Sequence, residues 1–437
     1  MNRRILKLAI PNIISNISVP LLNLIDLGLI GHLESEQYIG AVSVGGVIFN
    51  LIYWSFVFLR MSSSGFTAQA YGERNLKETA YILIRGLTVA LAGNVIILIF
   101  QGFVAYAGLL MVDASSEVES LAREYFFIRI YSAPATIALF VIFGWFTGMQ
   151  NSKSPMIITI ILNIFNIGLD YAFIKYFDLR SNGVAWGSLC AQYLGLFFSL
   201  WIIYRYYGKI FRNIKFRDAF ELKKMKNFFM VNKDIFIRTV CVLVVFTVFT
   251  SRSASQNDIV LATNALLLQF LMFFSYLMDG FAFAAEALTG KYYGAKDYSN
   301  LKKSVGYIFR WAIGIAVVFT LTYLLLGDLF VRVLTNNDKI IEYAYEYIIW
   351  IALIPLASFA SFTWDGVYIG MTASKEMRNT MILSSLFVFL PIIVFFKAWI
   401  GNHALWLAMN LFMISRAVSQ TILFPKVCKR ILAGSPQ

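Results

Sequence analysis

Twelve long apolar runs divide this sequence of 437 residues, and each run is long enough to cross a lipid bilayer. A spanning α-helix takes about 20 predominantly apolar residues. Because lipid offers no hydrogen-bonding partner, a spanning segment must satisfy its backbone internally, as a helix does. The sequence therefore predicts an all-α polytopic membrane protein with twelve transmembrane helices. The runs cover residues 5–31, 39–66, 81–110, 121–147, 155–177, 183–206, 228–250, 260–289, 305–326, 343–370, 381–399 and 403–426.

The composition excludes several other classes of protein. The chain is 59% hydrophobic and 14% charged, whereas soluble domains average roughly 45–50% apolar and about 25% charged residues. The net charge of +13 comes from basic residues in short gaps between the runs, so we assign it to the membrane surface and expect no nucleic-acid partner. The sequence contains no P-loop and no zinc-protease motif, and its three cysteines lie far apart. We therefore expect neither an enzyme nor a cofactor.

The basic residues also predict how the helices are oriented. If both termini are cytoplasmic, the inner segments hold 24 Lys and Arg residues and the outer segments hold 7. Short loops rich in Lys and Arg remain in the cytoplasm. We therefore expect a multi-pass protein of the plasma (inner) membrane with both termini inside.

The longest hydrophilic stretch, residues 207–227, lies between the sixth and seventh runs and carries seven Lys and Arg residues. It predicts a cytoplasmic basic linker resting on anionic lipid headgroups. On either side we expect a six-helix lobe, residues 1–206 and residues 228–437.

The two halves of the chain show an internal repeat with one constant offset along the sequence. The offset that aligns Gly144 with Gly366 also aligns Thr67 with Thr289. Gly144 and Gly148 form a G-x-x-x-G motif in the first half, and Gly366 and Gly370 form one in the second. This spacing allows close helix packing. Because one offset relates separate segments, we expect two six-helix bundles related by a pseudo-two-fold axis along the membrane normal.

Insertion of an acidic residue at membrane depth costs about 2.5–3.5 kcal/mol of free energy on insertion scales. Such residues usually face a cavity or a partner. Asp26 ends a long apolar stretch, and Asp170 follows Asn163 and Asn166. The spacing of four places Asn166 and Asp170 on one helical face. A proton or cation site is the favoured interpretation. The alternatives are an interfacial Asp26 and a purely structural polar stripe.

Three acids of the second half, Asp279, Glu286 and Asp365, also lie within apolar runs. Buried structural pairing and transport chemistry remain equally open for them. The basic residues at membrane depth that could neutralise some of the acids are Arg60, Arg129, Arg238, Arg310 and Arg416.

Several motifs resemble the multidrug and toxic compound extrusion (MATE) transporters, and especially their DNA-damage-inducible F (DinF)-like branch. The resemblance covers nearly the whole chain, and the segments that carry it are residues 11–16 (PNIISN), 24–31 (LIDLGLIG), 58–65 (FLRMSSSG), 279–286 (DGFAFAAE) and 364–370 (WDGVYIG). It implies two six-helix bundles in a V, alternating between inward and outward openings.

The resemblance also implies roles for individual residues. Asp26, Asn166 and Asp170 match the family's ion site, with Ser188 in place of a usual Thr. The site would take H⁺ or Na⁺, the latter held by Asp26, Asn166 and Asp170. A proline matching Pro11 is the family's bending point in the first helix, and Pro20 is a second candidate hinge.

The function expected from this resemblance is secondary active efflux of small drug-like organic compounds, cationic or amphipathic, in exchange for H⁺ or Na⁺, by a monomer in the lipid bilayer. The alternative is a lipid-linked oligosaccharide flippase of the related superfamily.

Overall fold

The computed structural model describes residues 1–31, 36–110, 115–212 and 214–433, and all regular secondary structure in these residues is helical. Twelve of the described helical segments are long and apolar enough to cross a membrane. The number of spans that the apolar runs predict is therefore confirmed.

The chain divides into two compact units. We call Ile14–Phe228 the N-terminal unit, and Phe229–Gln437 together with Met1–Ile13 the C-terminal unit. Helix α1 (Asn2–Ile30) therefore contributes its first residues to one unit and the rest to the other.

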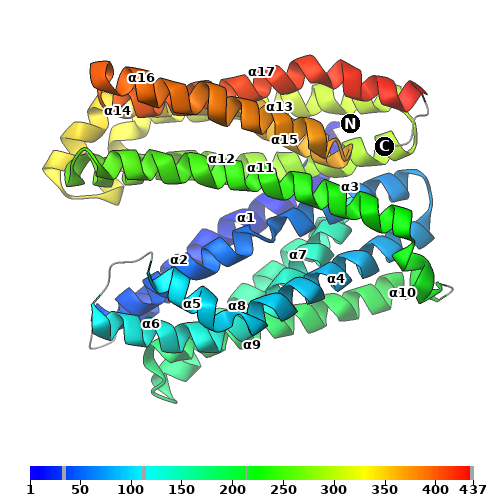
Figure 1. The fold of residues 1–437 in the computed structure, drawn as a ribbon, viewed down its shortest axis with the longest axis horizontal. Helices are drawn as coiled ribbons and strands as arrows, with labels where there is room; N and C mark the ends of the chain where they lie inside the picture. The colour runs from blue at the N-terminus through cyan, green and yellow to red at the C-terminus, as the bar shows by residue number, and fades with distance from the viewer. Residues whose placement is uncertain (32–35, 111–114, 213, 434–437) are drawn as a thin grey trace. The chain divides into compact units, whose positions relative to one another are not determined.

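The N-terminal unit continues from α1 through a series of helices and short helical turns (Figure 1). They are α2 (Glu36–Trp54), α3 (Val57–Gly72), α4 (Leu76–Ile99), α5 (Gln101–Leu109), α6 (Ser116–Arg129), η1 (Ile130–Ser132), α7 (Ala133–Gly148), α8 (Lys153–Lys175), α9 (Arg180–Ile202), η2 (Ile203–Tyr207), α10 (Gly208–Phe211) and η3 (Phe216–Phe220).

The C-terminal unit combines helices of 31–37 residues with one span that a π-helical segment divides into shorter helices. They are α11 (Leu222–Ala254), which begins just before the unit boundary, α12 (Asp258–Gly294), α13 (Tyr298–Leu334), α14 (Asp338–Gly370), α15 (Ser374–Ser384), the π-helical η4 (Ser385–Phe389), α16 (Leu390–Ile400) and α17 (His403–Ala433).

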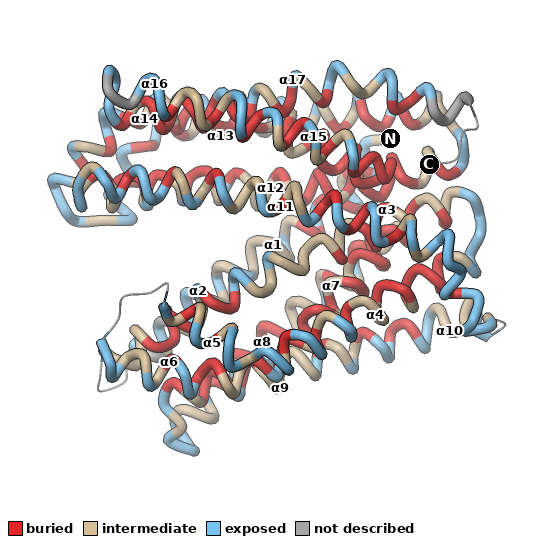
Figure 2. Tube along the Cα trace, in the orientation of Figure 1, coloured by how far each residue is buried: buried red, intermediate tan, exposed pale blue. Residues whose placement is uncertain are grey.

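Buried and exposed stretches alternate along the helices (Figure 2), and large apolar residues are found in both classes. Trp145 and Phe146 are fully buried, whereas Leu325 is 78% exposed and Phe387 is 73% exposed. Soluble proteins rarely expose large apolar surfaces to water, whereas lipid chains contact such surfaces without a free-energy penalty. The exposed faces are therefore those of a multi-pass membrane protein.

The internal repeat is confirmed by two matching helix contacts. A Cβ atom on Gly144 would lie 2.1 Å from the carbonyl oxygen of Arg60, and one on Gly366 would lie 2.3 Å from that of Ala282. The two glycines and the two carbonyls are related by the same offset along the sequence. In each unit the backbones approach so closely that only glycine fits.

The backbone turns repeat at this offset as well. Arg74 and Lys296 have positive φ angles of 58° and 54°, and Gln150 and Thr372 have values of 62° and 50°. Left-handed conformations are uncommon for residues other than glycine. Their recurrence at equivalent positions shows that the duplication includes the turns as well as the helices.

Candidate functional site

The polar stripe of α8 faces α1 inside the N-terminal unit. Asn163 Nδ2 donates to Ser18 Oγ at 3.0 Å, which joins the two helices ahead of the acidic residue of α8. Farther along α8, Asn166 and Asp170 are buried. The helical spacing thus places all three side chains on the inward face, as the sequence predicts.

Asp170 is fully buried and is held by a neighbour on its own helix. Asn166 Nδ2 donates to Asp170 Oδ2 at 3.0 Å. Space for the carboxylate comes from Gly187 of α9, where a Cβ atom would lie only 1.7 Å from Asp170 Oδ1. Gly187 was not singled out in the sequence, because a single glycine in an apolar run carries no signal of its own.

The carboxyl groups of Asp26 and Asp170 come within hydrogen-bonding range of each other. Asp26 Oδ1 and Asp170 Oδ1 are both buried, and no N–H or hydroxyl donor in the described part of the chain reaches either oxygen. Two acids from helices far apart in the sequence therefore lie close together, and each has one oxygen that accepts no hydrogen bond from a described donor. A proton or a small cation would satisfy it.

A half-buried arginine lies in the field of both acids. Arg129 of α6 donates through Nη1 to the hydroxyl of Tyr125, and its guanidinium lies 5.1 Å from the centre of the Phe49 ring. It interacts electrostatically with Asp26 and Asp170. The sequence identifies Arg129 as a possible counter-charge but does not predict which acids it acts on, and Tyr125 was missed.

Ser188 and the two prolines are placed as follows by the structure. Ser188 is buried on α9, but among the described residues it is not a hydrogen-bond partner of Asp170. Helix α1 continues through Pro11 and Pro20. The boundary between the two units falls shortly after Pro11.

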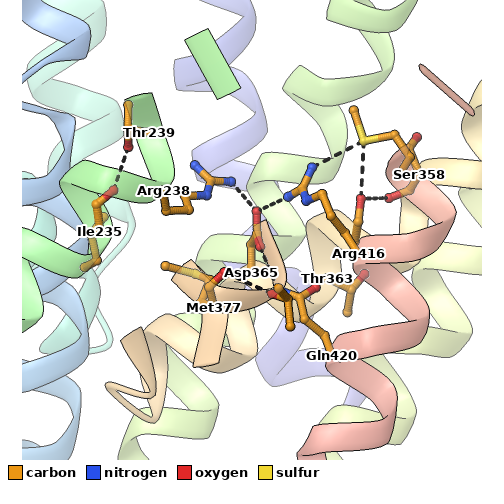
Figure 3. Close-up of polar contacts among 12 residues, drawn as sticks. Ile235, Arg238, Thr239, Ser358, Thr363, Asp365, Met377, Arg416 and Gln420 are labelled. Atoms are coloured by element: carbon orange, nitrogen blue, oxygen red, sulfur yellow. Dashed lines mark hydrogen bonds and ion pairs between the residues drawn. The ribbon is translucent and has the colours of Figure 1, made fainter. Parts of the chain in front are cut away.

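The C-terminal unit contains a second polar cluster, centred on Asp365 of α14 (Figure 3). Arg238 of α11 and Arg416 of α17 both donate to Asp365 Oδ2, the latter at 2.6 Å. Gln420 Nε2 donates to Asp365 Oδ1 at 3.1 Å. Two of the five basic residues at membrane depth, Arg238 and Arg416, thus form ion pairs with Asp365.

The other two acids of the second half are on α12. Glu286 of α12 is buried and Asp279 is half-buried. In the described part of the chain, the hydrogen-bonding partners of Asp365 are Arg238, Arg416 and Gln420, and neither acid is among the groups bound to it.

A resident metal centre is not indicated by the described residues, which include no group of three or more His, Cys, Asp or Glu side chains suited to a metal ion. A Na⁺ ion at the acid pair would depend on Asp26, Asp170 and the amide oxygen of Asn166, because the amide nitrogen is engaged with Asp170.

Comparison with known proteins gives consistent matches over nearly the whole chain. The MatE family model matches residues 11–172 and 235–395. The DNA damage-inducible protein F of Escherichia coli K12 is 35% identical over 419 residues, which are 94% of this chain and 89% of that protein. These matches do not favour the flippase alternative.

Solved structures match the fold at low sequence identity. An outward-facing multidrug resistance MATE family transporter of the MOP superfamily has a TM-score of 0.87 at 18% identity, covering 99% of this chain and 96% of its own. The Vibrio cholerae MATE transporter VcmN in a bent form has a TM-score of 0.87 at 15% identity, covering 99% and 98%.

Proposed function

The chain belongs to the MatE family, and from this premise we propose that it is a secondary active multidrug efflux transporter. It exports drug-like organic compounds, cationic or amphipathic, in exchange for H⁺ or Na⁺ by alternating access. Asp26 and Asp170 bind the coupling ion. The protein works as a monomer in the plasma (inner) membrane, with both termini in the cytoplasm.

The contact between Asp26 and Asp170 carries this proposal. A hydrogen bond between two carboxyl groups needs a proton on one of them, so the pair is suited to take up and release a proton. Each acid also keeps one buried oxygen that no described donor reaches. Ionisable groups at membrane depth with unmet capacity are characteristic of ion pathways.

Helix α1 links ion binding to a change of conformation. Pro11 and Pro20 each remove one backbone hydrogen bond and so weaken the helix against bending. Asp26 follows both prolines on this helix, whereas Asp170 is fixed on α8 by Asn166. Bending of α1 therefore makes or breaks the acid pair, and binding of an ion favours the conformation in which the pair is closed.

The driving force depends on the charge that is exchanged. Exchange of one H⁺ for one monovalent organic cation is electroneutral and uses the pH gradient, which supplies about 1.4 kcal/mol per pH unit. Export of a neutral or anionic compound against H⁺ also uses the membrane potential, about 2.3 kcal/mol per 100 mV.

The first prediction tests the acid pair directly. In reconstituted vesicles loaded with ethidium, Asp26→Asn and Asp170→Asn each reduce pH-driven or Na⁺-driven export to the level of protein-free vesicles, because an amide takes up no proton near neutral pH and brings no negative charge to hold Na⁺. The measurement is the initial rate of ethidium movement after a pH step and, separately, after a Na⁺ step. The gradient that supports export in the unmodified protein identifies the coupling ion.

The control is Asp328→Asn, an exposed residue of α13 paired with Arg332, which should keep the rate of the unmodified protein. Undiminished ion-driven export in both acid variants would remove Asp26 and Asp170 from the mechanism.

A further inference from the structure

The Asp365 cluster holds more positive than negative charge. Arg238 and Arg416 both donate to the same oxygen, Asp365 Oδ2 (Figure 3). The charged groups that act on Arg416 are Asp365 and Arg238. Because a guanidinium stays protonated in proteins, two positive charges face one carboxylate. The cluster therefore carries one surplus positive charge inside the C-terminal unit.

The two guanidiniums also have donors left over. Arg238 Nε and Arg416 Nε are buried and have no acceptor among the described residues. A guanidinium carries five N–H donors, one of them on Nε. Here Asp365 uses the Nη2 edge of each arginine and leaves both Nε–H groups unmet. Each remaining Nε–H is a charge-assisted donor from which a second oxyanion can accept a hydrogen bond.

The arrangement of the cluster is set by its surroundings. Trp364 Nε1 donates to Thr421 Oγ1 at 2.7 Å, and the hydroxyl of Tyr368 donates to the carbonyl of Gln420 at 2.6 Å. These bonds flank Asp365 on α14 and hold α17 against it. The donors of α17 are thus fixed before any ligand arrives, which reduces the cost of ordering them on binding.

The two arginines differ in how far they can be reached. The side chain of Arg416 is 3% exposed and that of Arg238 is 14% exposed. An approaching group would therefore meet Arg238 first and Arg416 behind it.

We propose that Arg238 and Arg416, with Asp365 as their resident counter-ion, bind the anionic group of an amphipathic organic molecule, a carboxylate, sulfonate or phosphate. A purely structural pair requires one guanidinium for one carboxylate, and a buried surplus charge is strongly unfavourable unless an anion offsets it. The inference rests on the proposed efflux function and names a substrate class for it, amphipathic anions.

The test uses two probes with the same ring system, 2-naphthalenesulfonate and the neutral 2-naphthalenesulfonamide. Binding to the full chain in phosphatidylcholine nanodiscs is measured by calorimetry. The unmodified protein should prefer the sulfonate, and Arg238→Gln should weaken sulfonate binding by about tenfold or more, about 1.4 kcal/mol. This variant leaves Asp365 paired with Arg416, so the remaining cluster is neutral and the fold is retained.

Two further variants separate charge from geometry. Arg238→Lys keeps the charge but loses the planar fork, so its sulfonate affinity should lie between those of the unmodified protein and Arg238→Gln. Arg310→Gln removes an exposed positive charge from α13 of the same unit and should leave sulfonate affinity unchanged. Equal binding of sulfonate and sulfonamide by the unmodified protein, or equal sulfonate affinity in Arg238→Gln and Arg310→Gln, would overturn the proposal.

A second arm distinguishes a transported solute from a lipid headgroup. Nanodiscs that contain phosphatidylglycerol should leave sulfonate affinity unchanged if the site serves solutes. Competition by phosphatidylglycerol that Arg238→Gln abolishes would identify the occupant as a lipid phosphate at the same anion site, which would overturn the assignment to a transported solute.

The inference and the proposed function can fail separately. Binding is measured without an ion gradient, so Asp170→Asn should lose driven export and keep sulfonate affinity. Ion-driven export that survives in the acid variants would contradict the function and leave the anion site standing. Acid-dependent ethidium export without sulfonate binding would contradict the anion site alone.

Discussion

The two units share a backbone plan but treat buried charge in opposite ways. In the N-terminal unit two acids, Asp26 and Asp170, meet with oxygens that no described donor reaches. In the C-terminal unit one acid, Asp365, receives hydrogen bonds from two arginines and a glutamine. The first arrangement sets two carboxyl groups against one arginine, Arg129, and the second sets two arginines against one carboxylate.

Neither polar arrangement is repeated in the other unit. At the offset that pairs the helix-contact glycines, Asp26 and Asp170 correspond to Val248 and Ile392. In the reverse direction, Asp365 and Arg416 correspond to Phe143 and Leu194. The glycines at the helix contacts are kept in both units, because a Cβ atom there would collide with backbone. The duplication therefore retains what the backbone requires and leaves the buried polar chemistry free to diverge.

The largest expected difference between the units is in the free energy of unfolding that is lost when one buried acid of each unit is replaced by asparagine. Asp365→Asn should lower the free energy of unfolding by about 3–5 kcal/mol, because two buried guanidiniums lose their counter-charge. Asp170→Asn should lower it by at most about 1 kcal/mol, because it removes a carboxylate with an unsatisfied oxygen. Unfolding of the purified protein in detergent, followed by tryptophan fluorescence, measures both. Equal losses would show that the two acids are held in the same way.

The helix contacts should behave alike in the two units. Gly144→Ala and Gly366→Ala each place a methyl group against a carbonyl oxygen, at 2.1 Å and 2.3 Å. Overpacking of this kind typically destabilises by about 1–3 kcal/mol. The matched controls are Gly102→Ala and Gly314→Ala, where a Cβ atom would meet nothing within 4 Å. A loss of thermal stability in only one of the two contact variants would contradict the structural repeat.

The smallest expected difference concerns a pair of equivalent helix caps. Asn75 accepts a hydrogen bond from the Glu78 backbone at the start of α4, and Asp297 accepts one from the Asn300 backbone at the start of α13. Substitution of either cap by alanine should cost about 1 kcal/mol at pH 7. The measurement is the change in unfolding temperature of each alanine variant.

Only one of these caps should respond to pH. Hydrogen bonds from the Asn300 backbone and side chain hold the pKa of Asp297 below its usual value. The stabilisation is therefore complete above the unfolded pKa of about 3.9 and is lost as pH falls through the lower folded pKa. The effect of Asp297→Ala should shrink in acid, whereas that of Asn75→Ala should stay constant, because an amide does not titrate. An acid-dependent effect at Asn75 would contradict this assignment.

Much of the fold follows from local patterns in the sequence. Run length and hydropathy predict twelve spans because the thickness of the bilayer sets the length of every helix. The constant offset between equivalent residues predicts the repeat, and the helical spacing of Asn166 and Asp170 predicts that they face the same way. The spans and the shared face depend on neighbours along one helix, and the repeat depends on comparing two linear patterns, so the sequence is sufficient to find them.

Contacts between helices could be decided only by the tertiary structure. The meeting of Asp26 with Asp170, the space left by Gly187, and the sharing of Asp365 by Arg238 and Arg416 each join segments that are separated in the sequence. The sequence shows that buried charges exist and that counter-charges are available. Which acid pairs with which partner depends on helix rotation and side-chain packing in three dimensions, and hydrophobic periodicity does not encode either of them.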